Sequence, residues 1–257
     1  MKKAILVVSF GAVCCEARMS SLDKIENEII EAFPGYLVYR AYTSGIIIKK
    51  IQKNEGIYID TLNEAFEKMK SDGITDVIVQ PTHMIDGIEY KKICRICNEH
   101  NSQFNSLKVG KAMLEDMEDC IKMVDAAAKE LNFNLKYEYI LMGHGSEDAA
   151  NIRYHQMNEA FIKKGYENVR IATVESKPDI DDAIECLKNK GTQNKVILQP
   201  FMVVAGDHAR NDMAGEKNSF YSKVKDAGYD AECVIIGLGE YKFLRNMIVE
   251  NLEGMIY

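Results

Sequence analysis

Short apolar runs that alternate with longer amphipathic segments constrain the fold of this chain more than any other feature. Apolar residues recur at helical spacing between the runs, as with Leu22, Ile25 and Ile29. The expected strands span residues 4–9, 37–41, 76–80, 106–109, 139–142, 169–173, 195–199 and 232–236, and the expected helices span residues 20–33, 61–71, 89–99, 115–131, 152–164, 180–190, 220–227 and 242–252. This alternation predicts an α/β fold whose parallel sheets carry helices on both faces.

The two halves of the chain resemble each other. Val77-Ile-Val-Gln-Pro81 recurs as Val196-Ile-Leu-Gln-Pro200, and residues 4–10 line up with residues 139–145. In this alignment Ser9 takes the place of His144, and Glu89 takes the place of His208. We therefore expect two similar doubly wound lobes, residues 1–133 and 134–257, with a ligand-binding cleft between them.

Composition and charge exclude several classes of protein. The chain of 257 residues is 47% hydrophobic, which is enough for a full core, yet it has no apolar stretch of membrane-spanning length. Residues 1–11 fit a first strand better than a signal peptide. A net charge of −7 without a basic stripe argues against nucleic acid. We expect no membrane partner, and a homo-oligomer stays open.

Cysteine usage indicates the cellular compartment. The seven cysteines follow no disulfide-framework spacing, so we expect free thiols in a reducing cytoplasm. Cys94 and Cys97 form a CxxC pair that falls inside an expected helix. No second CxxC is present to complete a zinc site, so we interpret the pair as incidental.

Two histidines and a glutamate follow apolar runs in the second half of the chain. His144 comes after the run 139–142, Glu175 after 169–173 and His208 after 195–199. Because ligands gather at the carboxyl ends of parallel strands, these side chains suit a divalent metal or a proton relay. The alternative is that the histidines are satisfied core residues. Glu89 could simply be an acidic residue in the first turn of a helix, where the helix dipole favours negative charge. His83 could cap a strand.

Several segments resemble one enzyme family over essentially the whole chain. The most specific is 198–213, with Gly206-Asp-His208 followed by Asn211-Asp-Met213; the others are residues 3–11, 40–45, 80–83, 87–90, 142–145 and 174–176. These segments resemble the anaerobic class II cobalt chelatases, which insert Co²⁺ into sirohydrochlorin during cobalamin biosynthesis. The family is related in fold to ferrochelatase, which implies the two-lobed chelatase-like architecture.

The resemblance implies roles for particular residues. The implied metal ligands are His144, Glu175 and His208. The implied catalytic residues are His144, Glu175 and Glu89, of which His144 and Glu89 would accept or carry away pyrrole protons. The residues that would bind the tetrapyrrole are Ser9, Phe10, Gly11, Thr43, Ser44, His83 and Arg210. Arg40 is a further candidate for the carboxylates of the substrate, because arginine matches carboxylate geometry.

The implied reaction uses Co²⁺ as the substrate metal, with Fe²⁺, Ni²⁺ or Zn²⁺ accepted in vitro. No nucleotide is expected, since the chain lacks a P-loop. Two alternatives stay open. One is a carrier that binds a tetrapyrrole or a metal without catalysis, and the other is a sirohydrochlorin ferrochelatase.

Overall fold

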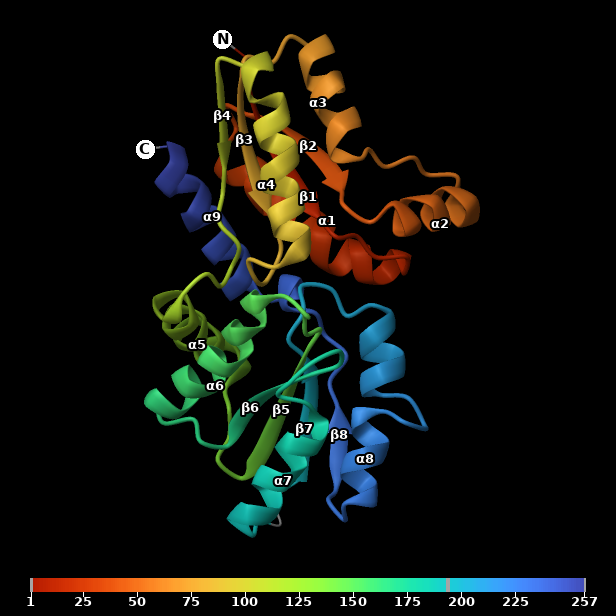
Figure 1. The fold of residues 1–257 in the computed structure, drawn as a ribbon, viewed down its shortest axis with the longest axis vertical. Helices are drawn as coiled ribbons and strands as arrows, with labels where there is room; N and C mark the ends of the chain where they lie inside the picture. Colours follow the sequence, from red (N-terminus) through yellow and green to blue (C-terminus); the bar gives the residue numbers. More distant parts are fainter. Residues whose placement is uncertain (1, 193–194, 257) are drawn as a thin grey trace. The chain divides into compact units, whose positions relative to one another are not determined.

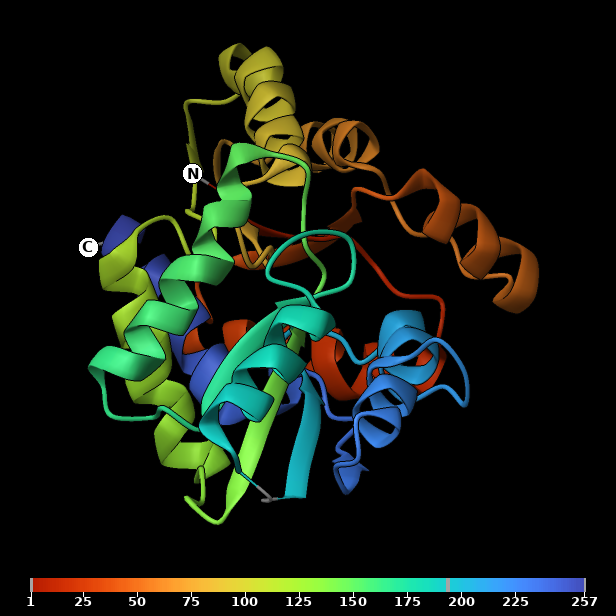
Figure 2. The ribbon, with the colours of Figure 1, turned by 60° about the horizontal axis from the view of Figure 1, so that its bottom comes forward.

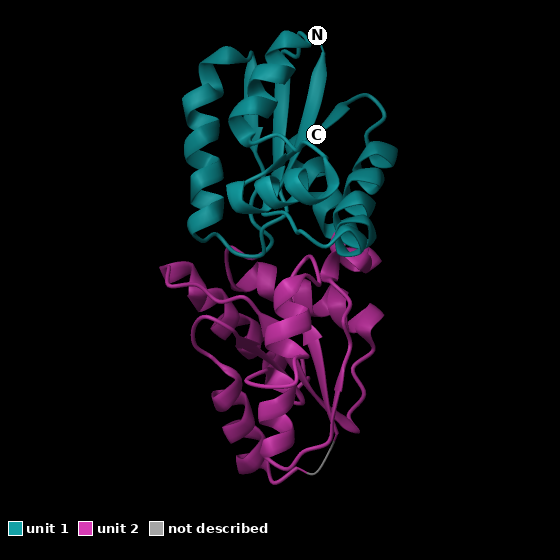
Figure 3. Ribbon diagram, turned by 90° about the vertical axis from the view of Figure 1, so that its right-hand side faces the viewer, with its two compact units in different colours: residues 1–113, 245–257 teal, residues 114–244 magenta. Residues whose placement is uncertain are grey.

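The computed structural model describes residues 2–192 and 195–256. These residues form two compact units: unit 1 (residues 1–113 and 245–257) and unit 2 (residues 114–244), coloured separately in Figure 3. Each unit contains a four-stranded parallel sheet flanked by helices. Among the described residues, no helix is both long enough and apolar enough to cross a membrane.

The sheet of unit 1 has the strand order β2-β1-β3-β4 (Figure 1). Its strands are β1 (Lys3–Ser9), β2 (Leu37–Tyr42), β3 (Asp76–Pro81) and β4 (Ser106–Val109). Val8 of β1 pairs in register with Ala41 and with Pro81. The carboxyl ends of β1, β2 and β3 therefore lie at one edge, and the loops that follow them are neighbours.

Helices cover both faces of this sheet because β1 is apolar on both sides. Its helices are α1 (Cys15–Ala32), α2 (Gly45–Glu55), α3 (Leu62–Ser71), α4 (Ile88–His100) and, from residue 245 on, α9 (Lys242–Ile256). Phe66 of α3 and Ile93 of α4 pack with Leu6 in one fully buried cluster. The opposite face carries α1 and α9, which are joined by Arg245 Nε and Glu28 Oε2 at 3.1 Å (Figure 1).

Unit 2 repeats this arrangement with the order β6-β5-β7-β8 (Figures 1 and 2). Its elements are α5 (Met117–Leu131), β5 (Tyr137–Gly143), α6 (Ile152–Lys163), β6 (Val169–Thr173), α7 (Ile180–Lys190), β7 (Lys195–Pro200), a π-helix (Ala209–Met213), α8 (Phe220–Asp226) and β8 (Ala231–Cys233). Leu187 of α7 and Val224 of α8 pack on Ile140 and Leu198 of the sheet. The other face is covered by α6, against which α5 packs.

The shared strand order confirms the predicted α/β fold with two similar doubly wound lobes. In the described residues, the repeated Gln-Pro segments are β3 and β7, which occupy the same place in their sheets. The expected strand at 232–236 ends earlier, at Cys233. Helix α2 was not among the expected helices, because Ile46, Ile47 and Ile48 are consecutive and hide the helical period.

The compact units differ from the expected domains 1–133 and 134–257. Helix α5 lies before the expected boundary, yet it belongs to unit 2, because it packs on α6. Residues 245–257 belong to unit 1, because α9 packs beside α1. A boundary drawn at a single position in the sequence cannot represent a chain that returns to its first unit.

Candidate metal centre

The three residues singled out in the second half of the chain lie at the ends of three adjacent strands of unit 2. His144 directly follows β5, Glu175 lies two residues after β6, and His208 lies beyond β7. Since β5 is hydrogen-bonded to both β6 and β7, the loops that carry these residues meet at one sheet edge. The expected convergence is therefore present within a single unit.

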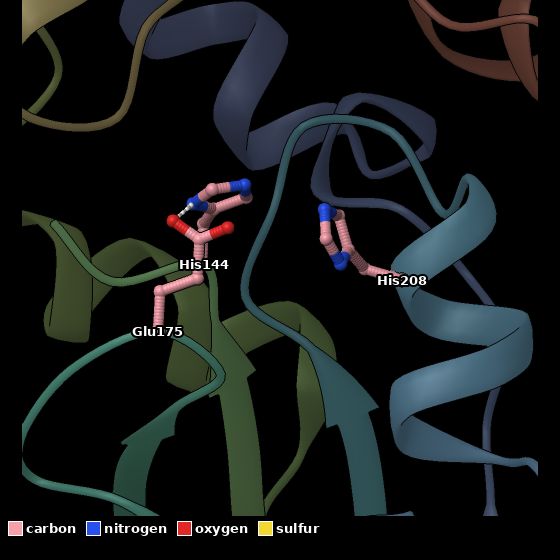
Figure 4. Close-up of side chains that lie close together, drawn as sticks. All are labelled: His144, Glu175 and His208. Carbon is pink, nitrogen blue, oxygen red and sulfur yellow. Dashed lines mark ion pairs between the residues drawn. The ribbon is translucent and has the colours of Figure 1, made fainter.

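The side chains of these residues form a compact cluster (Figure 4). One ligand atom from each of His144, Glu175 and His208 lies within 4.8 Å of the others. The Nδ1 atom of His144 is 3.4 Å from Oε2 of Glu175. The two imidazole rings stand edge to face, with centroids 4.7 Å apart and an interplanar angle of 84°. This spacing fits three donors around one ion.

Backbone hydrogen bonds hold the loops of His144 and Glu175 against each other. The amide of Glu175 donates to the carbonyl of His144 at 2.9 Å. Gly145 adopts a φ of +89°, and a Cβ there would lie 2.9 Å from both the Ser176 nitrogen and the Thr173 hydroxyl. Only glycine allows this close approach without strain, so the pairing of the two loops depends on Gly145.

The ring of Tyr154, on α6, packs against the end of β5. Its ring is so close to Gly143 that a Cβ at position 143 would lie 2.6 Å from Cε1. Burial raises the pKa of Tyr154 to about 12, and its hydroxyl is hydrogen-bonded to the backbone at Gly145 and His144. Its role is not evident from the sequence, because its helical spacing is that of any core residue.

Asp212 is a second residue of the site that was not among the expected site residues. Its Oδ2 atom lies 2.7 Å from Nδ1 of His208, one turn earlier in the chain. The spacing of four residues between a histidine and an aspartate was the available signal. Arg210, expected to bind the tetrapyrrole, is exposed on the same segment, two residues from His208.

The donor set of the cluster determines its chemistry. Two imidazole nitrogens and one carboxylate oxygen suit borderline divalent ions such as Co²⁺, Fe²⁺, Ni²⁺ and Zn²⁺. The side chains of His144, Glu175 and His208 are 41%, 53% and 39% exposed. Three protein ligands at an accessible place leave coordination positions open, which is typical of catalytic rather than structural sites.

A second group of expected site residues lies at the carboxyl edge of the sheet in unit 1. The amide of Thr43 donates to the carbonyl of Ser9 at 2.9 Å, and that of Ser44 donates to the carbonyl of Phe10 at 3.4 Å. Thr82 donates its hydroxyl to Ser9 Oγ at 2.9 Å. The loops after β1, β2 and β3 are thus joined, and Phe10 is left 46% exposed on them.

Gly11 follows Phe10 with a φ of +96°, and a Cβ there would lie 2.5 Å from the Tyr42 ring. This close approach requires glycine and fixes the path of the loop after β1. Arg40, a candidate for binding substrate carboxylates, is instead paired with Asp23 and Glu26. Its guanidinium is therefore committed to a network within unit 1.

His83 and Glu89 also belong to unit 1. Both ring nitrogens of His83 are shielded from solvent and make no hydrogen bond to any described residue. Burial lowers the pKa of His83 to about 4, and Glu89 and Lys92 act on it electrostatically. Glu89 lies in the first turn of α4, and its Oε2 atom is 3.6 Å from Lys92 Nζ.

Comparisons with known proteins identify relatives that align over nearly the whole chain. The sirohydrochlorin cobaltochelatase of Salmonella typhimurium is 34% identical over 255 residues, covering 98% of this chain and 96% of the relative. The sirohydrochlorin cobaltochelatase CbiKC of Nitratidesulfovibrio vulgaris is 27% identical, covering 99% of this chain and 91% of the relative.

Solved structures show the same fold. SirB from Bacillus subtilis with Fe³⁺ has a TM-score of 0.66 at 14% identity, and the match covers 98% of this chain and 95% of SirB. The sirohydrochlorin chelatase SirB of Bacillus subtilis subspecies spizizenii in complex with cobalt has a TM-score of 0.62 at 15% identity, covering 99% and 98%. The model of the family described as "Cobalt chelatase (CbiK)" matches residues 3–257, so the chain belongs to the cobalt chelatase family.

Proposed function

We propose that this protein inserts Co²⁺ into sirohydrochlorin without using a nucleotide. The observation that carries the proposal is the convergence of His144, Glu175 and His208, with ligand atoms within 4.8 Å of one another. The relatives named sirohydrochlorin cobaltochelatase, which align over nearly the whole chain, identify the tetrapyrrole and the metal.

The cluster suits the delivery of a metal rather than its permanent storage. One carboxylate and two neutral imidazoles neutralise only part of the charge of a divalent ion. Transfer of the ion to a macrocycle that has lost two protons, and so carries two negative charges, is therefore still electrostatically favourable. Open coordination positions let nitrogen atoms of the tetrapyrrole begin to bind before the protein ligands leave.

Two pyrrole protons must leave while the metal enters. We assign their removal to His144 and Glu175 in unit 2 and to Glu89 in unit 1, since imidazole and carboxylate groups are the usual proton acceptors. His144 and Glu175 are close enough for a proton on the imidazole to be stabilised by the carboxylate, at 3.4 Å. These side chains would then release the metal ion to the macrocycle and take up the protons that the pyrroles lose.

We assign the binding of the tetrapyrrole to the residues that the family resemblance implies. The proposed residues are Ser9, Phe10, Gly11, Thr43, Ser44 and His83 of unit 1 and Arg210 of unit 2. Exposed Phe10 offers an apolar surface to the macrocycle. Backbone and hydroxyl donors of the loops after β1 and β2, with the guanidinium of Arg210, would contact substrate carboxylates.

The test is anaerobic absorbance spectroscopy of sirohydrochlorin with Co²⁺, with and without the protein. We expect the wild type to accelerate formation of the cobalt complex. In His144→Ala and His208→Ala, the catalysed rate should fall by at least about 100-fold, which is the order of magnitude that an acid–base group contributes. His155→Ala is the matched control, because His155 is exposed on α6 of the same unit. Its rate should equal that of the wild type.

Other outcomes identify the alternatives. Binding of the tetrapyrrole or the metal without acceleration would make the protein a carrier, and faster insertion of Fe²⁺ than of Co²⁺ would make it a sirohydrochlorin ferrochelatase. A cytoplasmic location, the absence of nucleic-acid and membrane partners, and any homo-oligomer stay predictions from the sequence.

A further inference from the structure

We propose that Asp212 is a positioning residue that holds His208 with its Nε2 atom directed to the metal. The inference deepens the proposed function and rests on it, because it concerns the same metal cluster. It assigns a role to a side chain outside the three ligands.

A hydrogen bond joins His208 and Asp212. His208 Nδ1 lies 2.7 Å from Asp212 Oδ2. A carboxylate oxygen only accepts, so Nδ1 must carry the hydrogen. Neutral imidazole has one N–H, and Nε2 of His208 is therefore left with the free lone pair. Figure 4 shows the ring of His208 facing His144 and Glu175.

The segment that carries Asp212 is anchored in the core of unit 2. His208 directly precedes the π-helix Ala209–Met213. Ala209 and Met213, at the two ends of this turn, are fully buried at 0% exposure. The backbone that carries His208 and Asp212 is thus anchored in the core of unit 2, while both side chains project from it. A carboxylate held in this way limits rotation of the imidazole.

The two histidines differ in the partners of their Nδ1 atoms. Nδ1 of His144 lies 3.1 Å from the carbonyl oxygen of Gly145, which also leaves Nε2 as the free nitrogen. Nδ1 of His144 also lies 3.4 Å from Oε2 of Glu175, but Glu175 is itself one of the proposed ligands. Nδ1 of His208 instead has the carboxylate of Asp212, which is not among the proposed ligands, at 2.7 Å. A carboxylate partner strengthens a metal-binding imidazole as an electron donor. His208 is therefore the firmer ligand of the pair.

Asp207 provides a matched control for Asp212. It lies next to His208 in the sequence and is exposed, and its Oδ1 atom accepts a hydrogen bond from Asn211 Nδ2 at 3.1 Å. Asp207→Asn removes the same charge from the same segment but retains the partner of His208 Nδ1. A general loss of negative charge and a specific loss of positioning are thereby separated.

The experiment measures Co²⁺ binding to the full chain without any tetrapyrrole, by calorimetry and by the visible absorption of bound Co²⁺. We expect Asp212→Asn and Asp212→Ala to weaken the affinity by about 10- to 100-fold. Asp207→Asn should change it less than about twofold, because the exposed Asp207 carboxylate is screened by solvent and is not the partner of His208 Nδ1. Nitrogen NMR of the metal-free protein should show His208 protonated at Nδ1 in the wild type, and this preference should be lost in Asp212→Ala.

Three results would overturn the proposal. They are a Co²⁺ affinity of Asp212→Asn equal to that of the wild type, an equal loss in Asp207→Asn, and an unchanged His208 tautomer in Asp212→Ala. The isosteric Asp212→Asn variant keeps the test decisive if the alanine variant fails to fold. A wild type that binds Co²⁺ but does not accelerate insertion would contradict the proposed function and leave the role of Asp212 intact.

Discussion

His144 and Glu175 are fixed to each other twice, once through side chains and once through the backbone. Nδ1 of His144 lies 3.4 Å from Oε2 of Glu175, and the amide of Glu175 donates to the carbonyl of His144 at 2.9 Å. Because they follow the neighbouring strands β5 and β6, the sheet sets the distance between them. The two side chains are therefore preorganised, which would reduce the entropic cost of the metal binding that we propose for them.

The carboxylate of Glu175 should contribute strongly to Co²⁺ affinity, because it is the one negatively charged member of the cluster. We expect Glu175→Gln to weaken Co²⁺ binding by at least about 10-fold, since a charged ligand to a dication is lost. Calorimetric titration with Co²⁺ measures the change. Glu147→Gln is the control, because Glu147 is exposed in the loop after β5. Unchanged affinity in Glu175→Gln would remove Glu175 from the ligand set.

Gly145 should be needed for the geometry of the cluster as well as for stability. We expect Gly145→Ala to destabilise the protein by about 1–3 kcal/mol through backbone strain, with an added cost from steric overlap. A Cβ there meets the Ser176 nitrogen at 2.9 Å, so the loop of Glu175 must shift and Co²⁺ binding should weaken. Urea denaturation and Co²⁺ titration report the two effects.

Gly165→Ala is the control that distinguishes backbone strain from steric overlap of the added Cβ. Gly165 has a similar φ of +82°, but a Cβ there would meet nothing within 4 Å. Gly165→Ala should therefore be destabilising through strain alone and should leave Co²⁺ affinity unchanged. If both variants bound Co²⁺ as the wild type does, the close approach at Gly145 would have no role in the site.

The fold and the convergence of three candidate metal ligands could be predicted from the sequence because both depend on local patterns. Apolar runs in parallel strands are nearly continuous, and residues just past them converge at one sheet edge whatever the loops do. The convergence of His144, Glu175 and His208 needed only this rule, whereas their role as metal ligands was implied by the family resemblance. The matched order of the two sheets follows from the repeat of Val77–Pro81 at Val196–Pro200.

Other features depend on contacts that no local pattern encodes. Tyr154 has the spacing of an ordinary core residue, and only the structure places its hydroxyl at the backbone of His144. The engagement of Arg40 by Asp23 and Glu26 joins residues distant in sequence. Likewise, the assignment of α5 to unit 2 depends on its packing against α6.

Arg18 should stabilise the loop after β1. Its side chain is 5% exposed, and Nη1 donates to the carbonyls of Ala12 and Val13 at 3.1 and 2.8 Å. The same guanidinium pairs with Glu55 of α2. We expect Arg18→Met to lower the free energy of unfolding by about 1–3 kcal/mol, because carbonyls of this loop lose their donor. Urea denaturation measures the change.

Glu55→Gln is the comparison for Arg18→Met. It removes the charge but keeps an acceptor for Arg18, and the contacts to Ala12 and Val13 are preserved. Its effect on the denaturation midpoint should be smaller than that of Arg18→Met. A larger effect would mean that the ion pair, rather than the carbonyl contacts, stabilises the loop.

His83 should make the stability of the protein fall in mild acid. Burial lowers its pKa to about 4 in the folded protein, with Glu89 opposing this shift and Lys92 adding to it. In the unfolded chain the pKa of histidine is about 6.5. Below that pH the unfolded chain binds a proton that the folded protein does not, so the free energy of unfolding decreases as the pH falls toward 4. The loss amounts to about 2–3 kcal/mol near pH 4.5.

Replacing His83 removes this titration and should flatten that part of the pH profile. We expect His83→Gln to lose less stability than the wild type between pH 7.5 and 4.5, by about 2 kcal/mol in urea denaturation. His155→Gln, at an exposed position on α6, should follow the wild-type profile. Equal losses in all three proteins would show that His83 takes up its proton as readily in the folded protein as in the unfolded chain. Its ring nitrogens would then have to be accessible to water, contrary to their burial.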